Sequence, residues 1–287
     1  MTDISVWDKE IPVPVRLIQY IDQNVREKLP PGTQFHGIAP SGSSYWARTA
    51  KIDATDANGE PTPFFIKVHQ FEHGKNMVSS EFYAMKLLYS IIPEMPDTYF
   101  FICRFRELSN DIPDVADFPA LLAEFHGRSK SAAGDFGFPI TMFGGRNPQT
   151  FPLTKSWEEC FSKGLDKIFD MEEQTHGPDE EMQRLRDGLM TKLIPRLLRP
   201  LETEGRVLVP SLVHGDLWDG NASADVETGR PMIFDATPLY AHKEYEMGPW
   251  WCNRHKMTHA YIEEYIKHMP RSEPVADFED RGALYNL

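Results

Sequence analysis

One short stretch of this sequence places residues capable of phosphate chemistry at a fixed spacing. It reads His-Gly-Asp-Leu-Trp-Asp-Gly-Asn from His214 to Asn221, and an apolar segment ending in Asp235 follows. Asp216 can accept or orient the proton of a substrate hydroxyl. Asn221 can supply a neutral oxygen ligand and Asp235 a carboxylate to Mg²⁺, which prefers oxygen ligands and keeps several waters. The spacing therefore indicates a phosphotransfer site that uses ATP and Mg²⁺, with Asp216 catalytic and Asn221 and Asp235 binding the metal.

The offset of five residues between Asp216 and Asn221 is also that of the protein-kinase catalytic loop. An isolated His-Gly-Asp would more often be a turn with a capping Asp. The full pattern, with the offset Asn and the later Asp, is much rarer and favours a kinase. We expect His214 to pack and form hydrogen bonds beneath the loop as a structural residue.

A lysine and a glutamate form a second candidate pair. Lys67 lies in the apolar segment 64–68 and Glu81 stands fourteen positions later, at the start of an expected helix. A buried cation is costly unless it is paired, and in kinases a strand lysine holds the nucleotide phosphates and pairs with a helix glutamate. The alternatives are a lysine that faces water on an edge strand and a glutamate favoured by the helix dipole.

Small residues precede these strands at Ser41-Gly42-Ser43-Ser44. Small side chains let backbone N–H groups approach phosphate oxygens. Ser43 and Ser44 are therefore predicted to bind the nucleotide, although Ser-Gly clusters are also ordinary turns.

These residues must be positioned by two different kinds of structure. The first part of the chain is predicted to form strands at 44–53, 64–68 and 99–105, with a turn at Asn58-Gly59 and a helix over 79–92. The second part is predicted to form helices at 118–127, 157–171, 180–198 and 257–268, with a short strand at 231–235. Strands followed by helices indicate an α+β chain. We expect a β-rich N-lobe over 1–108 and a helical C-lobe over 109–287.

Composition excludes several classes of protein. The net charge of −13 argues against nucleic-acid binding. No window contains the roughly 18–20 consecutive apolar residues of a membrane span. The N-terminus does not resemble a signal peptide, and three cysteines without metal-type spacing suggest a reduced, cytoplasmic protein.

The chain resembles the fructosamine/ketosamine 3-kinases, within the wider group of aminoglycoside- and choline-kinase-like phosphotransferases. The resemblance runs from about Pro40 to the end, and Trp218 beside His-Gly-Asp distinguishes this family more than that tripeptide does. Further matching segments are Glu124-Phe125-His126, Phe136-Gly137-Phe138, and Phe234-Asp235-Ala236 followed by Tyr240 and Glu244.

The resemblance implies a bilobal protein-kinase-like fold and phosphorylation of the sugar 3-hydroxyl of ketoamine adducts, a deglycation reaction. Its substrates would be ribulosamines or fructosamines on small amines or protein lysines. Several features depart from the family, among them His242-Lys243 where relatives often show Asp-Arg. Ser43 and Ser44 stand where some relatives carry Gly and Cys, so a redox switch is not expected. Ala236-Thr237 replaces the usual Pro-Ala, and relatives tend to continue with a further helix after Leu284-Tyr285, which suggests a shortened chain.

The substrate site is expected near Trp218 and Asp219. A tryptophan beside the catalytic Asp suits a sugar face or a cation, and Asp219 could pair with the cationic nitrogen of the adduct; core packing and turn formation are the alternatives. Trp250 and Trp251 are expected mainly in the core. One rival function is another small-molecule kinase, and a second is a non-catalytic pseudokinase. The sequence leaves the oligomeric state open.

Overall fold

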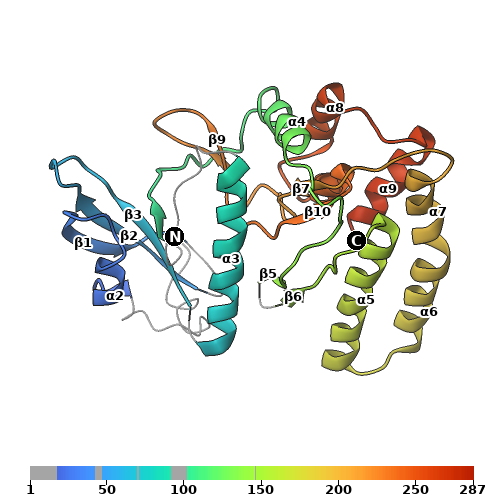
Figure 1. Ribbon diagram of the computed structural model, residues 1–287, viewed down its shortest axis with the longest axis horizontal. Coiled ribbons are helices and arrows are strands. Elements are labelled where there is room, and N and C mark those ends of the chain that lie inside the picture. Colours follow the sequence, from blue (N-terminus) through green and yellow to red (C-terminus); the bar gives the residue numbers. More distant parts are fainter. Residues whose placement is uncertain (1–17, 43–46, 70, 92–101, 146) are drawn as a thin grey trace. The chain divides into compact units, whose positions relative to one another are not determined.

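The computed structural model describes residues 18–42, 47–69, 71–91, 102–145 and 147–287 (Figure 1). The chain divides into two compact units. The first comprises Met1–Glu107 with Gly145–Asn147, and the second comprises Leu108–Gly144 with Pro148–Leu287. Ser43 and Ser44 lie outside the described residues, so their role in nucleotide binding stays a prediction.

The first unit contains an antiparallel four-stranded sheet in the order β1-β2-β3-β4. The strands are β1 (Gln34–Pro40), β2 (Arg48–Thr55), β3 (Phe64–Val68) and β4 (Ile102–Arg104). Alternate side chains of β2 and β3 point to one face and form its core with Ile18; these are Ala50, Ile52, Ala54, Phe64 and Ile66. The short helix α2 (Gln23–Arg26) packs Val25 against this core.

The connection between β2 and β3 contains the tight turn that Asn58-Gly59 predicted. The Asp56 carboxylate accepts hydrogen bonds from the backbone N–H groups of Asn58 at 2.8 Å and Glu60 at 2.9 Å. Gly59 has a φ of +85°, which is a conformation that glycine adopts at little cost. The turn fixes the register of the hairpin, which pairs Thr49 with Lys67.

The long helix of the first unit, α3 (Phe71–Ile91), begins eight residues earlier than the periodicity predicted (Figure 1). Ala84 and Met85 are buried in this helix, and Glu81, one turn earlier, is buried as well.

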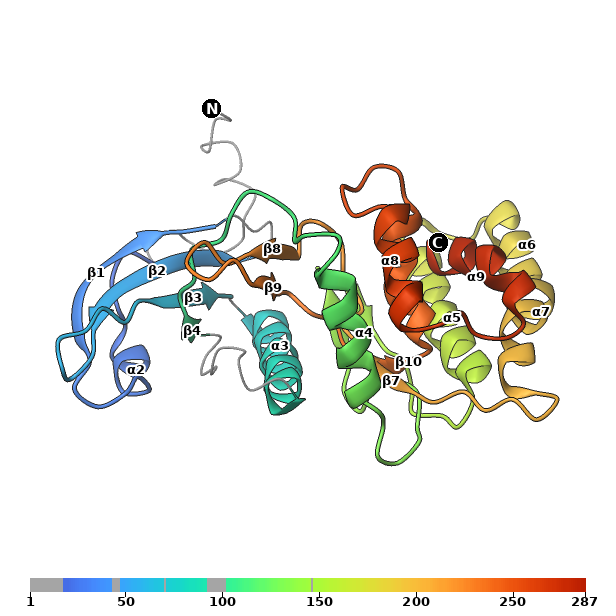
Figure 2. The same ribbon diagram turned by 90° about the horizontal axis from the view of Figure 1, so that it is seen from above.

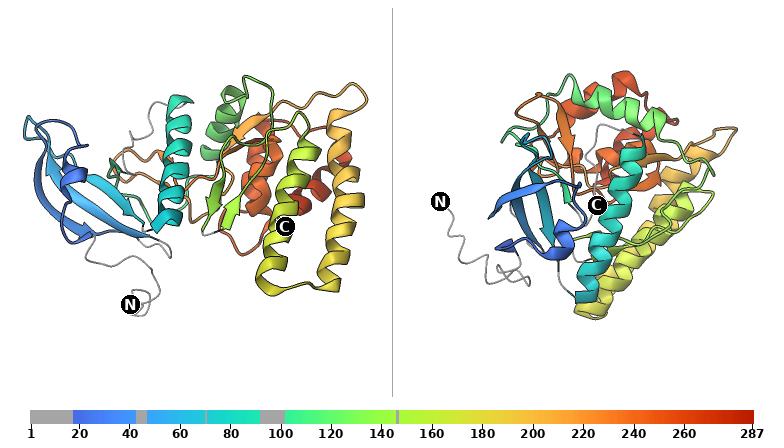
Figure 3. Two further views of the ribbon diagram at one scale, coloured as in Figure 1. Left: turned by 60° about the horizontal axis from the view of Figure 1, so that its bottom comes forward. Right: turned by 60° about the vertical axis from the view of Figure 1, so that its left-hand side comes forward.

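Helices dominate the second unit: α4 (Phe118–Arg128), α5 (Trp157–His176), α6 (Glu180–Gly188), α7 (Ile194–Leu198), α8 (His259–His268) and α9 (Phe278–Tyr285). Helices α4 and α8 lie side by side (Figure 2). Helices α5 and α6 run antiparallel (Figure 3), and Arg186 on α6 joins them through ion pairs to Asp166 and Asp170.

The helix expected over 180–198 is interrupted by a π-helical turn at Leu189–Leu193. Pro195 stands two residues after this turn, and it has no N–H to donate to the preceding turn. A widened turn accommodates this loss, and the chain continues as α7 and a 3₁₀ helix, Arg199–Glu202.

Short strands and a 3₁₀ helix surround the segment 214–221. Strand β7 (Ser211–Val213) pairs with β10 (Leu239–Ala241), and β8 (Ala222–Ala224) pairs with β9 (Pro231–Ile233), both antiparallel. The 3₁₀ helix Lys243–Trp251 follows β10. The remaining elements are β5 (Met142–Gly144), β6 (Asn147–Gln149) and the 3₁₀ helix Val275–Asp277. Among the described residues, no helix combines the length and apolar character that crossing a membrane requires.

Candidate active site

The loop from His214 to Asn221 begins where β7 ends and leads into β8. Gly215 has a φ of +81°, and a Cβ there would collide with the main-chain oxygen of Thr237. Thr237 N in turn donates to the main-chain oxygen of His214 at 2.9 Å. The glycine therefore allows the chain to turn sharply against the segment that follows Asp235, and this turn places Asp216.

Asp216 and Asn221 are in direct contact. Asn221 Nδ2 donates to the main-chain oxygen of Asp216 and to its Oδ2, each at 2.9 Å. The amide nitrogen is thus engaged by Asp216, and the metal-ligand role predicted for the amide oxygen of Asn221 stays a prediction. Asn221 N also donates to the main-chain oxygen of Trp218 at 2.9 Å, which closes the loop.

Burial raises the pKa of Asp216 to about 6, and the carboxylates of Asp235 and Glu246 add to this effect while the hydrogen bond from Asn221 opposes it. A carboxylate with a pKa close to neutrality can accept a proton from a hydroxyl and later release it. The environment of Asp216 thus suits a general base.

Asp235 has a left-handed backbone, with a φ of +55°, directly after the short strand β9. Such backbone conformations are uncommon outside glycine and are concentrated at functional sites. His214 is fully buried and its Nε2 contacts the main-chain oxygen of Phe234 at 2.9 Å. Burial lowers the pKa of His214, which favours a neutral imidazole that donates this hydrogen bond. His214 therefore holds the chain immediately before Asp235.

The buried carboxylate of Glu246 holds the start of the loop 214–221. Its carboxylate accepts the backbone N–H of His214 through Oε2 and that of Gly215 through Oε1, the latter at 3.0 Å. His126 on α4 contacts two residues through its two ring nitrogens. Its Nε2 lies 3.3 Å from Glu246 Oε2, and its Nδ1 lies 2.7 Å from the hydroxyl of Tyr265 on α8. Burial alone would raise the pKa of Glu246, but the hydrogen bonds and nearby imidazoles hold it below its ordinary value. An ionised carboxylate thus links α4, α8 and the loop.

Lys67 and Glu81 form the ion pair that burial of the lysine required. Lys67 Nζ lies 2.9 Å from Glu81 Oε1, with side-chain exposures of 11% and 12%. Both residues belong to the first unit. Their contact with nucleotide phosphates stays a prediction.

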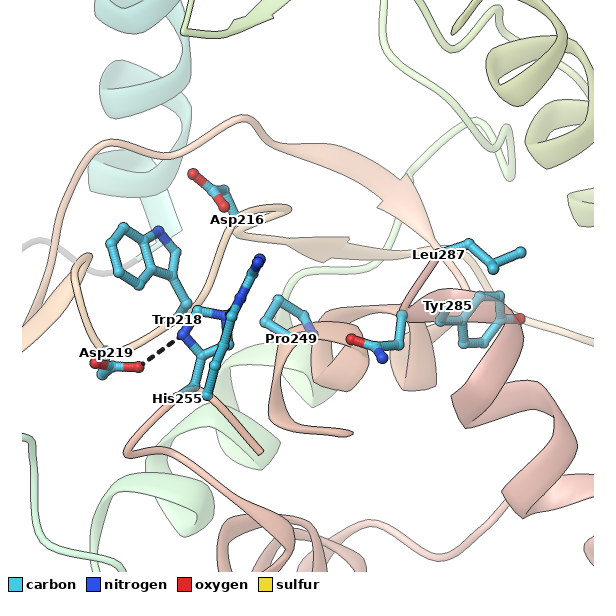
Figure 4. A pocket seen from close by; sticks show the side chains of 9 residues that line it. Asp216, Trp218, Asp219, Pro249, His255, Tyr285 and Leu287 are labelled. Atoms are coloured by element: carbon cyan, nitrogen blue, oxygen red, sulfur yellow. Dashed lines mark hydrogen bonds and ion pairs between the residues drawn. The ribbon is translucent and has the colours of Figure 1, made fainter. Parts of the chain in front are cut away.

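A pocket of about 510 Å³ opens in the second unit beside Asp216 (Figure 4). Trp218, Asp219, Pro249, Arg254, His255 and the segment 285–287 also line it. Trp218 is 36% exposed, and its ring packs against that of His255 with centroids 5.3 Å apart. The structure thus brings Asp216 and the two predicted substrate residues to one pocket.

Asp219 is engaged more fully than the sequence predicted. Its Oδ1 lies 3.0 Å from His255 Nδ1 and accepts the backbone N–H of Lys256 at 3.0 Å. The sequence did not predict a role for Arg254 and His255. They follow Asp219 by 35 and 36 positions, and no known motif has that spacing. The only signal was a run of polar residues after two tryptophans. Trp250 itself is buried and donates from Nε1 to the main-chain oxygen of Leu217 at 2.8 Å, so it braces the loop from the core.

Comparison with known proteins gives this geometry a context. The sequence profile of the family described as fructosamine kinase matches residues 47–287. A protein-ribulosamine 3-kinase, chloroplastic, from Oryza sativa subsp. indica is 31% identical over 268 residues, which cover 89% of this chain and 72% of the relative.

Solved structures share the fold. A protein assigned as a fructosamine-3-kinase from Thermobifida fusca superposes with a TM-score of 0.67 at 17% identity, covering 89% of this chain and 85% of the other. An aminoglycoside phosphotransferase in ternary complex with AMP-PNP and hygromycin B superposes with a TM-score of 0.53 at 14% identity, covering 92% and 87%. The expected α+β, protein-kinase-like fold is thereby confirmed. With a profile match over most of its length, this chain belongs to the fructosamine kinase family.

Proposed function

We propose that this chain is an ATP- and Mg²⁺-dependent kinase that phosphorylates the sugar 3-hydroxyl of ketoamine adducts, ribulosamines ahead of fructosamines. The observation that carries the proposal is the contact between Asp216 and Asn221 at the edge of a pocket, in a chain of the fructosamine kinase family. The named activities of relatives support the ketoamine as acceptor, since they include protein-ribulosamine 3-kinases and a mouse ketosamine-3-kinase.

In this proposal Asp216 carries the acid–base chemistry. Its carboxylate accepts the hydrogen bond of the sugar 3-hydroxyl and takes the proton as the oxygen bonds to the γ-phosphorus of ATP. The bond from that phosphorus to the β–γ bridging oxygen breaks, and ADP leaves with the electron pair. Lys67, held by Glu81, would position the α- and β-phosphates.

The side chains also fit a magnesium ion. Asn221 and Asp235 would hold it through an amide oxygen and a carboxylate, and when bound it would neutralise charge on the phosphates. Within the described part of the chain, no group of three or more His, Cys, Asp or Glu residues could hold a metal ion. This donor set suits Mg²⁺, which completes its shell with phosphate oxygens and water, better than a metal caged by protein ligands.

The biological role that follows is repair of glycated amines, including protein lysines, because a 3-phosphate makes the adduct labile. The cytoplasmic location expected from the sequence stays a prediction. Trp218, exposed beside Asp216, would contact the sugar face.

The test is ATP consumption by the purified protein with ribulose-, erythrulose- and fructose-amine adducts, compared with the free sugars, choline and an aminoglycoside. We expect turnover with the ketoamines and little with the others. Turnover of choline or the aminoglycoside alone would support the rival small-molecule kinase. Nucleotide binding without turnover of any acceptor would support the pseudokinase.

A further inference from the structure

A cationic side chain lines the pocket beside Asp216 and has no part in the phosphotransfer proposed above. Arg254 is exposed at the pocket, in the loop after the 3₁₀ helix Lys243–Trp251. Its Nε donates to Nε2 of His255 at 3.3 Å. The guanidinium is therefore bound to its neighbour through Nε, and within the described part of the chain no hydrogen bond or ion pair engages its terminal amino groups.

His255 connects this arginine to the predicted substrate residues. Because Nε2 accepts from Arg254, the ring proton lies on Nδ1, which donates to Asp219 Oδ1 at 3.0 Å (Figure 4). The side chain of His255 is only 11% exposed, and its ring packs on Trp218. Asp219, His255 and Arg254 thus form one chain of hydrogen bonds that fixes where the guanidinium stands.

The pocket therefore presents charges of both signs. The carboxylates of Asp216 and Asp219 lie on its wall together with the guanidinium of Arg254. In the described ranges, no carboxylate forms an ion pair with Arg254. The two terminal amino groups of a guanidinium match the two oxygens of a carboxylate.

We propose that Arg254 is a specificity residue that binds a carboxylate on the amine part of the ketoamine. An adduct of an amino acid carries a cationic secondary amine and a carboxylate a few bonds apart, which is the charge pattern of this pocket. Adducts of free amino acids are then used in preference to adducts of uncharged amines. His255 acts as a positioning residue for Arg254. The inference rests on the proposed ketoamine kinase function and names the substrate subclass.

A matched pair of substrates tests it, ribulosyl-glycine and ribulosyl-glycinamide, which differ only in the carboxylate. With wild-type protein we expect kcat/KM for the acid to exceed that for the amide roughly tenfold, mostly through KM, because an interaction made equally in ground and transition states acts on KM. Arg254→Gln is expected to abolish this preference, because kcat/KM falls far more for the acid than for the amide. Arg128→Gln, which removes an exposed arginine of α4, is expected to retain the preference.

The outcomes separate this inference from the function on which it rests. Equal use of acid and amide by wild-type protein, or equal loss of both in Arg254→Gln, overturns the inference and leaves the kinase assignment standing. Absence of turnover with either ketoamine overturns the proposed function itself. A third substrate, the amide carrying a 5-phosphate on the sugar, identifies the source of the anion. If Arg254→Gln removes a preference for that compound and not for the acid, the arginine reads sugar phosphate and the carboxylate assignment is wrong.

The positioning role of His255 has its own readout. His255→Ala removes both the acceptor of Arg254 Nε and the donor to Asp219, so we expect the preference for the acid to fall while kcat on the amide changes less. His255→Gln, which can supply an acceptor to Arg254, is expected to restore part of the preference. A preference that survives in His255→Ala would contradict this role.

Discussion

The side-chain amide of Asn221 donates two hydrogen bonds to Asp216, one to its main-chain oxygen and one to Oδ2, each 2.9 Å long. One residue thus orients the carboxylate expected to act as base, and its own amide oxygen remains for the predicted role of metal ligand. A change at Asn221 can therefore affect both the predicted base and the predicted metal site, so each role needs its own measurement.

The first prediction concerns the base. Asp216→Asn keeps the shape of the side chain but cannot take up a proton, so kcat should fall by a factor on the order of 10²–10⁴. Nucleotide binding measured by calorimetry should be nearly unchanged. Asp111→Asn, at an exposed position of the same unit, serves as the control and should keep full activity. Near-normal turnover by Asp216→Asn would remove this residue from the chemistry.

The second prediction concerns the metal. Asp235→Ala should abolish the Mg²⁺-dependent part of ADP binding, and Asn221→Ala should weaken it, because a carboxylate contributes a charge as well as an oxygen. Calorimetric titrations with ADP in Mg²⁺ and in EDTA measure the difference directly. If both variants show the wild-type difference between the two conditions, the metal is held elsewhere.

The third prediction concerns Lys67 and Glu81. Lys67→Met should raise KM for ATP and lower kcat, because its charge would position the phosphates in both ground and transition states. Glu81→Gln should have a smaller effect of the same kind. The double variant should be less impaired than the sum of the two, with a coupling of about 0.5–3 kcal/mol, since the residues are in contact. Strict additivity would mean that the 2.9 Å pair seen here has no role in activity.

Features of the site can be predicted from the sequence where one strong physical requirement acts on one residue. A lysine flanked by apolar residues needs a buried partner, and Glu81 supplies it. The pattern from His214 to Asn221 was recognisable because its spacing is rare. Both cases rest on local sequence or on a single costly group.

The remaining features depend on packing that no short segment specifies. Strand β1 lacks a clear alternation and forms because β2 offers an open edge to pair with. The π-helical turn at Leu189–Leu193 follows from Pro195 meeting an otherwise regular helix. The contacts of Asp219 with His255 depend on how a distant loop returns to the pocket, so the sequence could suggest the carboxylate but not its partner.

The fourth prediction concerns Glu246, whose carboxylate holds the start of the loop 214–221. In the wild type both carboxylate oxygens of Glu246 accept backbone N–H groups, those of His214 and Gly215. Glu246→Gln replaces one of these oxygens with an NH₂ group, which cannot accept, so one buried N–H group loses its partner. The free energy of unfolding should fall by about 2–4 kcal/mol, and kcat should fall with KM for ATP little changed. Glu264→Gln on α8, whose partners Lys267 and His268 are exposed, is the surface control and should change stability by less than about 0.5 kcal/mol. Urea unfolding supplies the comparison, and equal stability of the two variants would contradict a stabilising role of Glu246.

The last prediction concerns stability against pH and rests on His242. This side chain is fully buried, with Nδ1 2.9 Å from the hydroxyl of Tyr285 and Nε2 2.9 Å from Ser272 Oγ. Burial lowers its pKa to about 4, against about 6.5 for an unfolded histidine. Between these two values the unfolded chain binds a proton that the folded chain does not, so the free energy of unfolding falls as pH decreases from about 6.5 toward 4.

His242→Gln can keep hydrogen bonds to Tyr285 or Ser272 but cannot titrate. Its unfolding free energy should therefore fall less steeply than that of the wild type over this window, even if the variant is less stable at pH 7. His259→Gln, at a side chain that is 51% exposed on α8, controls for the loss of a histidine and should follow the wild-type curve. Urea unfolding midpoints at half-unit steps from pH 7 to pH 4.5 provide the measurement. Parallel curves for His242→Gln and wild-type protein would show that this histidine does not contribute to the acid sensitivity of the fold.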